Sequence, residues 1–185
     1  LLDRTSLTSL DLNGLIGNAT NGVVLWLANI TNKSKPNQLT KLEFDGTASP
    51  TLFKSLTQLS LEQNDLSSVR SLLLNNLSAL DYYRIDHFGA LTSIQMVNCP
   101  VAHNFDWMTP VTSAEGIDVV MTNSFNFSDF YMALWGDDSY IPLFNSLRSM
   151  RLADSRDILT AIAVADAPNL KSLSLQGYPN LTALH

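Results

Sequence analysis

The sequence of 185 residues predicts an α/β solenoid, in which a coiled chain returns again and again to one parallel sheet. Three observations predict it. A Leu-x-x-Leu-x-Leu spacing recurs along the chain, polar residues fill the positions between the leucines, and several connecting segments are long enough to hold a helix. Together these patterns predict a repeated unit with an apolar inner side and a polar outer side.

The leucine spacing is clearest in residues 170–184, LKSLSLQGYPNLTAL. Side chains alternate along a strand, so Leu173 and Leu175 point to the same side, and Leu170 turns the corner into the strand. One such strand cannot bury its apolar face, but a second copy about 4.8 Å away continues the core. Each buried leucine contributes about 1.5–3 kcal/mol. Parallel neighbours need crossover connections, so the chain should wind as a coil.

Copies of the spacing follow one another in irregular steps. The clear copies are LTSLDL (7–12), LTKLEF (39–44), LTQLSL (56–61), LTSIQM (91–96), LRSMRL (147–152) and LKSLSL (170–175). The weaker copies are Leu77, Leu80 and Tyr82, with Leu80, Tyr83 and Ile85 as a competing register, and Ala114, Ile117 and Val119. A single stack of these copies predicts that Leu10, Leu42, Leu59 and Leu173 lie on adjacent strands.

The motif Leu-x-x-Leu-x-Leu-x-x-Asn/Cys is that of the leucine-rich-repeat family, which this sequence resembles. Residues 56–64 match it fully, and residues 91–99 match it with Ile94 and Met96 in place of leucines. The resemblance implies a right-handed solenoid with one parallel concave sheet, and irregular loops and short helices on the convex side. It also implies that Cys99 bonds loop backbone inside the coil rather than acting as a nucleophile.

The domain organisation follows from the same pattern. Residues 1–185 are predicted to form a single leucine-rich-repeat domain. Solenoid ends normally carry atypical capping repeats, and the pattern here runs into both ends, so we expect a fragment of a longer array.

Three connecting segments are predicted to be helical because their apolar residues recur at helical spacing or their ends carry cap residues. They span residues 67–74, 128–136 and 157–165. Ser128 can cap the start of the second segment and Gly136 can end it. Residues 21–30 fit a helix or a strand equally well, because Val23 and Val24 favour a strand.

The positions between the leucines form a predicted binding face on one shared sheet. In the first half of the chain this face is acidic, with Lys41 as its cation, and in the second half it is neutral and small. An acidic strip would suit a basic or polar protein partner. The candidate binding residues are Asp11, Lys41, Glu43, Asp45, Ser60, Glu62, Asp81, Tyr83, Gln95, Asp118, Arg151 and Ser174.

Composition and motifs narrow the function classes. A net charge of −6 without a basic run argues against nucleic-acid binding, and no stretch approaches the roughly 18 apolar residues of a membrane span. His87 beside Asp86, and His103 near Asp106, lack the spacing of a metal site. Gly-x-Ser-x-Gly and glycine-rich phosphate loops do not occur. We therefore expect no enzyme activity, no metal and no cofactor.

Asn-x-Ser/Thr sequons point to the secretory pathway. Six occur where this content of Asn, Ser and Thr would give about three by chance, although a chain merely rich in these residues is the alternative. Glycans are expected at Asn18, Asn29, Asn32, Asn76, Asn126 and Asn180. The expected location is extracellular or on the cell surface, with the cytoplasm left open.

The expected function is protein–protein recognition or adhesion by a secreted or cell-surface leucine-rich-repeat glycoprotein, through the concave sheet face. The first alternative is a structural or assembly module of an extracellular filament or surface layer, stacking onto neighbouring subunits. The second is a glycan-binding domain, for which the dense aromatic residues between positions 105 and 135 are the candidate feature. Such rings more commonly fill a wide core.

Overall fold

The computed structural model describes residues 9–11, 23–26, 40–47, 56–60, 67–80, 82–84, 88–99, 113–124, 129–132, 145–153, 160–164 and 167–184. These residues form thirteen strands: β1 (Ser9–Asp11), β2 (Val23–Trp26), β3 (Lys41–Asp45), β4 (Leu56–Ser60), β5 (Ser71–Asn75), β6 (Tyr82–Arg84), β7 (Ser93–Val97), β8 (Ile117–Thr122), β9 (Asp129–Met132), β10 (Leu147–Ala153), β11 (Ala161–Val164), β12 (Ser172–Gln176) and β13 (Ala183–Leu184).

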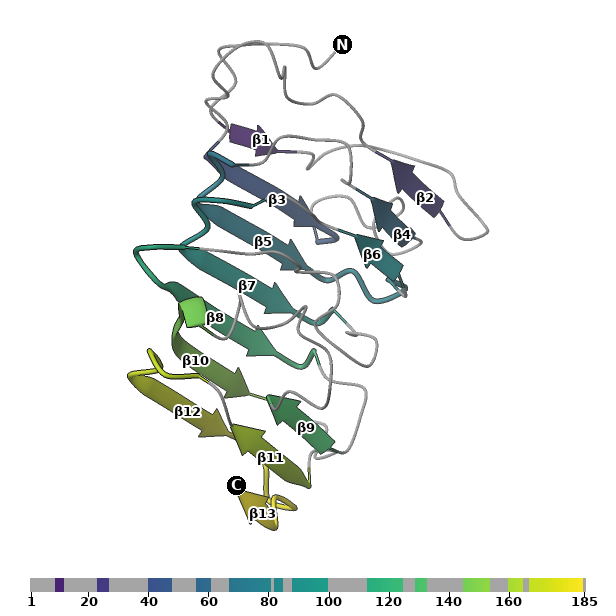
Figure 1. Cartoon of the computed structure of the whole chain (residues 1–185). Coiled ribbons are helices and arrows are strands. Elements are labelled where there is room, and N and C mark those ends of the chain that lie inside the picture. Colours follow the sequence, from purple (N-terminus) through teal and green to yellow (C-terminus); the bar gives the residue numbers. More distant parts are fainter. Residues whose placement is uncertain are drawn as a thin grey trace.

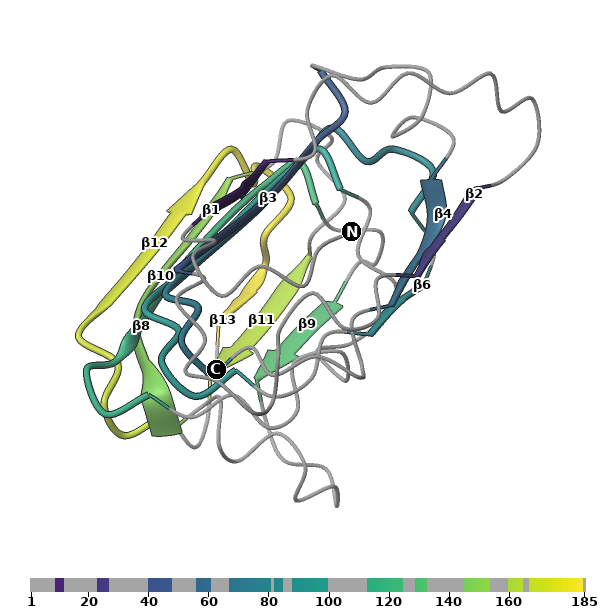
Figure 2. The ribbon, with the colours of Figure 1, turned by 90° about the horizontal axis from the view of Figure 1, so that it is seen from above.

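The strands form three parallel sheets (Figure 1). The largest has seven strands in the order β1-β3-β5-β7-β8-β10-β12, and two sheets of three strands have the orders β2-β4-β6 and β13-β11-β9. The seven-stranded sheet is one layer, and the two smaller sheets lie across the core from it (Figure 2). In most turns the chain leaves the large sheet, adds a strand to a small one and returns. The result is a parallel, solenoid-like arrangement with almost no helix in the described residues.

The apolar core lies under the seven-stranded sheet, in two rows of aligned side chains. One row contains Leu42, Leu72, Ile94, Val119 and Met150, and the next contains Phe44, Leu74, Met96, Met121 and Leu152. All ten side chains are at most 3% exposed. The inward direction that the alternating pattern predicts is therefore confirmed for these strands.

The prediction of one shared sheet is wrong for the copy that matches the repeat motif best. Leu59 is fully buried, as expected, but β4 pairs with β2 and β6 and not with β3. In the large sheet β3 lies between β1 and β5, with Glu43 beside Leu73 of β5. The leucine spacing specifies which face of a strand is buried. The inward-facing side chains of the large sheet and of the small sheets pack into the same core. The spacing alone therefore cannot assign a strand to a sheet.

The helix predicted over residues 67–74 is also wrong. Ser71–Asn75 form a strand, and the repeat in this segment is Val69-x-x-Leu72-x-Leu74, with all three side chains buried. Leu73, which a helix would have buried, lies on the outer side of the sheet and is partly exposed.

The other two helix predictions are also wrong, because each segment contains a strand. The segment 128–136 contains β9, and the segment 157–165 contains β11. Residues 21–30 contain β2, so the strand alternative is the correct one there. In the weak copy at Ala114, the two residues in register with the other strands are Val119 and Met121, two positions later than expected. In each case the parallel neighbour decides the outcome, because it supplies backbone hydrogen bonds that local propensity does not take into account.

The turns that end the central strands repeat one conformation. Asn76, Asn98 and Asn123 have positive φ values of 52°, 51° and 50°, a region that asparagine tolerates better than most residues. Their side chains form an asparagine ladder. Asn123 Nδ2 donates to Asn98 Oδ1 at 3.1 Å, Asn98 Nδ2 to Asn76 Oδ1 at 2.6 Å, and Asn76 Nδ2 to Thr47 Oγ1 at 2.6 Å.

Backbone contacts tighten the same edge. Asn76 N–H donates to the Val97 carbonyl at 2.8 Å, and Asn98 N–H to that of Thr122 at 2.9 Å. At Gly46 an added Cβ would lie 2.1 Å from the Asn76 carbonyl oxygen, so only glycine fits there. The ladder and these bonds hold successive turns in register at the ends of the strands.

Candidate functional site

The first candidate site is the outer face of the seven-stranded sheet, called the outer face below. The structure places eight of the predicted binding residues on strands of this sheet: Asp11, Lys41, Glu43, Asp45, Gln95, Asp118, Arg151 and Ser174. Ser60 and Tyr83 were predicted on the same sheet, and that placement is wrong, because they lie on β4 and β6 of a three-stranded sheet. Glu62 and Asp81 lie outside the described residues.

The acidic groups of the outer face are paired within the protein. Glu43 forms an ion pair with Lys41 on the same strand. Asp45 Oδ1 accepts hydrogen bonds from Asn75 Nδ2 at 2.9 Å and from the Thr47 N–H at 2.7 Å. Glu43 and Asp45 are thus engaged by neighbouring residues, which reduces the attraction these two acids could offer to a basic partner.

Asp118 is paired across two strands. It accepts two bonds from Arg148, including one from Nε at 3.0 Å, and one from the Ser149 hydroxyl at 2.6 Å. The Arg148 hydrogen bond lowers the pKa of the Asp118 carboxyl, against the smaller effect of burial. Both side chains are about two-fifths exposed, at 38% and 41%, so solvent screens the pair and its contribution to stability is small.

The middle of the outer face carries apolar side chains that the list of candidate residues lacked. Leu73, Val97 and Val120 are partly exposed on β5, β7 and β8. Gln95 lies between Leu73 and Val120 in one aligned row. The candidate residues predicted from the sequence are nearly all polar, and Leu73 lies in the segment for which a helix is predicted.

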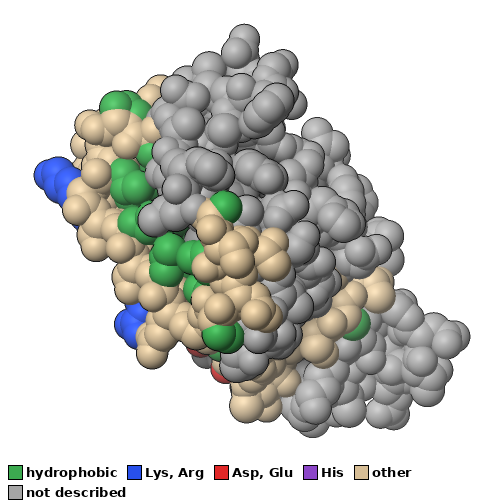
Figure 3. Space-filling view, turned by 90° about the horizontal axis from the view of Figure 1, so that it is seen from below, with side chains coloured by type: hydrophobic (Ala, Val, Ile, Leu, Met, Phe, Trp, Pro, Cys, Tyr) green, Lys and Arg blue, Asp and Glu red, His purple; other side chains and the backbone are tan. Residues whose placement is uncertain are grey.

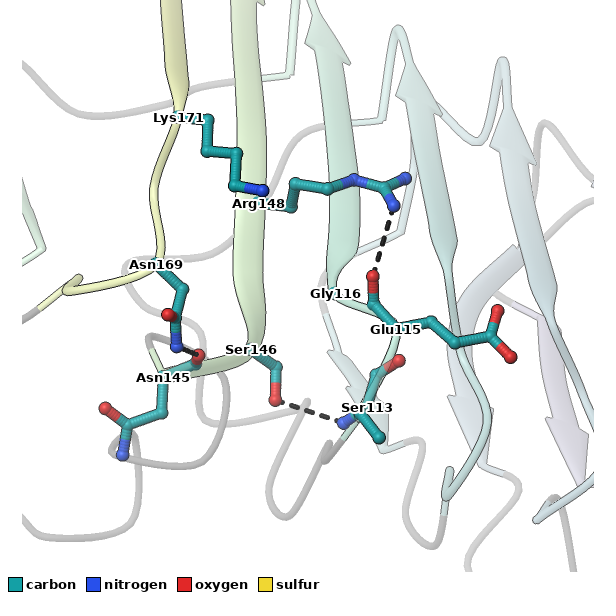
Figure 4. Close-up of a pocket in the computed structure, with 9 residues that line it drawn as sticks. Ser113, Glu115, Gly116, Asn145, Ser146, Arg148, Asn169 and Lys171 are labelled. Atoms are coloured by element: carbon teal, nitrogen blue, oxygen red, sulfur yellow. Dashed lines mark hydrogen bonds between the residues drawn. The ribbon is translucent and has the colours of Figure 1, made fainter.

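The second candidate site is a hollow of about 210 Å³ at the edge where β8, β10 and β12 begin. We call it the edge pocket. It is lined by Ser113, Ala114, Glu115, Gly116, Asn145, Ser146, Arg148, Asn169 and Lys171. Arg148 and Lys171 lie along one side, Ser146 and Ser113 along the opposite side, and Asn169 between them (Figure 4).

Polar bonds connect the three segments that form the edge pocket. Ser146 Oγ accepts the Ser113 N–H at 3.0 Å, Asn169 Nδ2 donates to the Asn145 carbonyl at 2.7 Å, and Lys171 N–H donates to the Arg148 carbonyl at 2.8 Å. These bonds link each segment to the next. The walls of the hollow are therefore fixed by contacts between residues far apart in the chain, which no local sequence motif reveals.

The charges of the edge pocket are unequally matched. The Glu115 carboxylate accepts two bonds from Arg70 Nη1, at 3.1 and 3.0 Å, and points away from the hollow (Figure 4). Arg148 is held by Asp118 and by the Glu115 carbonyl. Within the described residues, Lys171 has no ion pair, and its side chain is exposed. The unmatched charge of the edge pocket is therefore positive.

Cys99 is fully buried, and burial raises the pKa of its thiol to about 11. Its Sγ lies 3.2 Å from the Val97 carbonyl, and its N–H donates to Ser124 Oγ at 3.4 Å. A thiol in this environment stays protonated and does not act as a nucleophile near neutral pH.

No group of three or more His, Cys, Asp or Glu residues that could hold a metal occurs in the described part of the chain. All three histidines lie outside it.

Two of the six sequons can be placed. Asn180 lies exposed in the turn between β12 and β13, whereas the Asn76 amide is part of the asparagine ladder. Asn18, Asn29, Asn32 and Asn126 lie outside the described residues. Most of the aromatic residues between positions 105 and 135 lie outside them as well.

Comparisons with protein-family models, with curated proteins and with solved structures find no match to this chain. In the described residues, no helix has the length and apolar character needed to cross a membrane. Function must therefore be argued from the two candidate sites themselves.

Proposed function

We propose that this chain is a recognition module that binds another protein through the outer face. The supporting observation is the apolar centre formed by Leu73, Val97 and Val120, which lies among polar side chains of the same sheet. Protein interfaces share this anatomy, with a desolvated apolar core inside a polar rim. A rigid parallel sheet also presents its side chains with little conformational entropy left to lose on binding.

The paired acids change the kind of partner that we propose. Glu43 and Asp118 each have a cationic partner inside the protein, and Asp45 is held by neutral hydrogen-bond donors, so these acids are less available to a partner. We therefore propose recognition by shape and apolar contact, with polar groups fixing the register, rather than attraction of a basic partner.

For the finer fold, we propose a right-handed solenoid of the leucine-rich-repeat type. Support comes from the buried Leu77, Cys99 and Ser124, which follow the positive-φ asparagines at the position that the family motif gives to Asn or Cys. The hand follows from the general preference of parallel crossover connections. The short convex helices of the sequence prediction are not part of this proposal, because strands occupy the described parts of those segments.

We also propose a secreted or cell-surface location, supported by the number of sequons. Of the two described sequons, Asn180 is proposed to carry a glycan because it is exposed in a turn, and Asn76 to remain unmodified because a glycan would have to fit between Thr47 and Asn98 in the ladder. Peptide mass spectrometry of native material tests this proposal. An unmodified Asn180 would count against the secretory pathway, and a glycan on Asn76 would contradict the ladder.

The binding proposal is tested by adding a charge to the apolar centre. Screening the wild-type chain against a panel of purified ectodomains gives a partner, and Val120→Lys should weaken its binding at least ten-fold by desolvating a charge. Gly89→Lys is the matched control, because an added Cβ at Gly89 meets Ser67 at 3.6 Å, an ordinary contact away from the outer face. Equal affinity of the wild-type and Val120→Lys chains, both folded by circular dichroism, would remove the proposal.

An assembly role is the second candidate, and the C-terminal end of the stack favours it. Leu173 and Leu175 of β12 are partly exposed, although their register partners Met150 and Leu152 are buried. Hydrophobic side chains gather at this end of the molecule (Figure 3). Self-association through this end predicts a sedimentation coefficient that rises with concentration and a return to monomer in Leu175→Lys. A monomer at every concentration tested would exclude this candidate.

A further inference from the structure

We propose that the edge pocket binds a single carboxylate group presented by the protein partner, an aspartate or glutamate side chain. The inference rests on the recognition function proposed above and names the chemistry of one contact. It reverses the charge expected from the sequence, which predicted a basic partner for an acidic strip. The donors of the pocket, its size, its charge and its position beside the outer face all support it.

Hydrogen-bond donors dominate the inside of the edge pocket. The Lys171 ammonium supplies three N–H groups on an exposed side chain without an ion pair in the described residues. Ser146 Oγ accepts from Ser113 N–H, which leaves its hydroxyl hydrogen to donate. Asn169 Nδ2 uses one hydrogen on the Asn145 carbonyl and retains a second. Such a set of donors is complementary to an acceptor-only group.

The carboxylates beside the edge pocket that would repel an anion are already engaged. The Glu115 carboxylate accepts from Arg70 outside the hollow, and the Glu115 carbonyl accepts from Arg148 Nη1 at 3.1 Å. The Asp118 carboxylate is matched by Arg148 and Ser149. An entering carboxylate would therefore meet the ammonium of Lys171 without a competing carboxylate directed into the same space.

Size and charge select a carboxylate among anions. A hollow of about 210 Å³ is below the roughly 300 Å³ at which sites for whole small molecules begin, so it suits the end of a side chain. One unmatched ammonium balances a single negative charge. A phosphate group near neutral pH carries more charge and commonly recruits bidentate arginines, whereas the one arginine lining this hollow is already bonded to Asp118.

The position of the edge pocket indicates a protein as the source of the carboxylate. Arg148 lines the pocket and bonds Asp118, whose register partners on the outer face are Ser93 and Ser149. The pocket and the outer face are therefore neighbouring surfaces on the same strands. A partner lying on the apolar centre can reach the strand-start edge with an acidic side chain, and this contact would fix its register.

Nuclear magnetic resonance titration of the isotope-labelled chain tests the proposal. The probe is N-acetyl-glutamate N-methylamide, and the neutral glutamine analogue is the control ligand. We expect saturable shifts of the Ser146, Asn169 and Lys171 amides with the glutamate probe only, weakened by added salt because the contact is ionic. Lys171→Gln should reduce the affinity at least ten-fold, and Lys171→Arg should retain it. Arg84→Gln, which removes a cation on β6 of a three-stranded sheet, should leave it unchanged.

The opposing outcomes are equally specific. Equal shifts with the glutamine analogue, or an unchanged affinity in Lys171→Gln, would overturn the proposal. Tighter binding of glucuronate than of the glutamate probe would assign the carboxylate to a sugar acid and would also contradict it. Failure here is distinguishable from failure of the proposed function, because Val120→Lys tests the outer face alone. Partner binding that is lost in Val120→Lys and unchanged in Lys171→Gln would reject only the pocket.

Discussion

The last two strands of the seven-stranded sheet have the same leucine spacing but different burial. LRSMRL in β10 places Met150 and Leu152 at no more than 3% exposure, whereas LKSLSL in β12 leaves Leu173 and Leu175 partly exposed. The chemistry of the two repeats is nearly the same. The difference is that β10 has a described neighbour on both sides and β12 has one, on the β10 side. The spacing therefore sets the direction of a side chain, and neighbouring strands on both sides are needed to bury it.

Truncating a leucine in the centre and one at the end should give the largest contrast. We expect Leu74→Ala, in the fully buried row of β5, to lower the free energy of unfolding by about 2–5 kcal/mol. Leu175→Ala lies in the same row at the end of the sheet and should cost about 1 kcal/mol, because part of this side chain already contacts water. Urea unfolding of both variants measures the difference. Equal losses would mean that Leu175 is as well packed as Leu74, contrary to the structure.

Thiol reactivity provides a second contrast between the centre and the end. With its pKa near 11, Cys99 should be modified by a maleimide at pH 8 at least a hundred-fold more slowly than an exposed cysteine at Ser174→Cys in a Cys99→Ser background. The reason is that only a small fraction of the Cys99 thiol ionises at that pH, and burial also blocks access. The measurement is the labelling rate followed by mass spectrometry. A Cys99 that reacts as fast as the cysteine introduced at position 174 would show that the central turns open readily.

The turns at the ends of the strands should respond less strongly. Asn98→Ala removes two ladder bonds and forces alanine to a φ of 51°, for a loss of about 2–3 kcal/mol. Gly177→Ala places alanine at a φ of 81°, and this strain should lower the free energy of unfolding by about 1–2 kcal/mol. Asn98→Gly keeps the conformation and isolates the contribution of the bonds. Thermal unfolding of the three variants tests this order, and a harmless Asn98→Ala would argue against the ladder.

The Asp118 pair should have the smallest effect, and it should depend on pH. Because the folded-state pKa of Asp118 is lowered, its contribution is fully present above the unfolded value near 3.9 and is lost as the pH falls through the folded value. Both side chains are about two-fifths exposed, so solvent screening should keep the contribution small. The stability of Asp118→Asn should therefore approach that of the wild type as the pH is lowered from about 5 to about 3. If the stability difference between the wild type and Asp118→Asn stayed constant across this pH range, the lower stability of the variant would come from packing and not from the ion pair.

The inner rows of the core could be predicted from the sequence, and the sheet assignment could not. Alternation alone places Leu42, Ile94 and Leu152 inside, because an extended strand has only two sides. Leu59 shows the limit, since a strand in either layer buries its leucines in the same core. In residues 67–74, Val69 and Leu72 fit both helical and repeat spacing, and only the pairing with β3 and β7 decides between them.

The candidate sites were less predictable than the core, because they depend on register. Arg148 and Asp118 are 30 residues apart in the sequence, and Arg70 and Glu115 are 45 apart, yet each pair meets across the sheet. The counted charges of the sequence therefore could not show that Asp118 is paired with Arg148 and Glu43 with Lys41. The edge pocket depends on register as well, since its wall is assembled from three segments that are far apart in the sequence.

A crosslinking experiment tests the two-layer arrangement most directly. In a Cys99→Ser background, Glu43 and Leu73 are replaced by cysteine in one variant, and Glu43 and Ser60 in another. The structure places Glu43 beside Leu73 on adjacent strands, where a short bifunctional thiol reagent can bridge them, and Ser60 on a sheet across the core. We predict an intramolecular crosslink in the first variant and none in the second. A crosslink between positions 43 and 60, without one between 43 and 73, would contradict the arrangement and return β4 to the seven-stranded sheet.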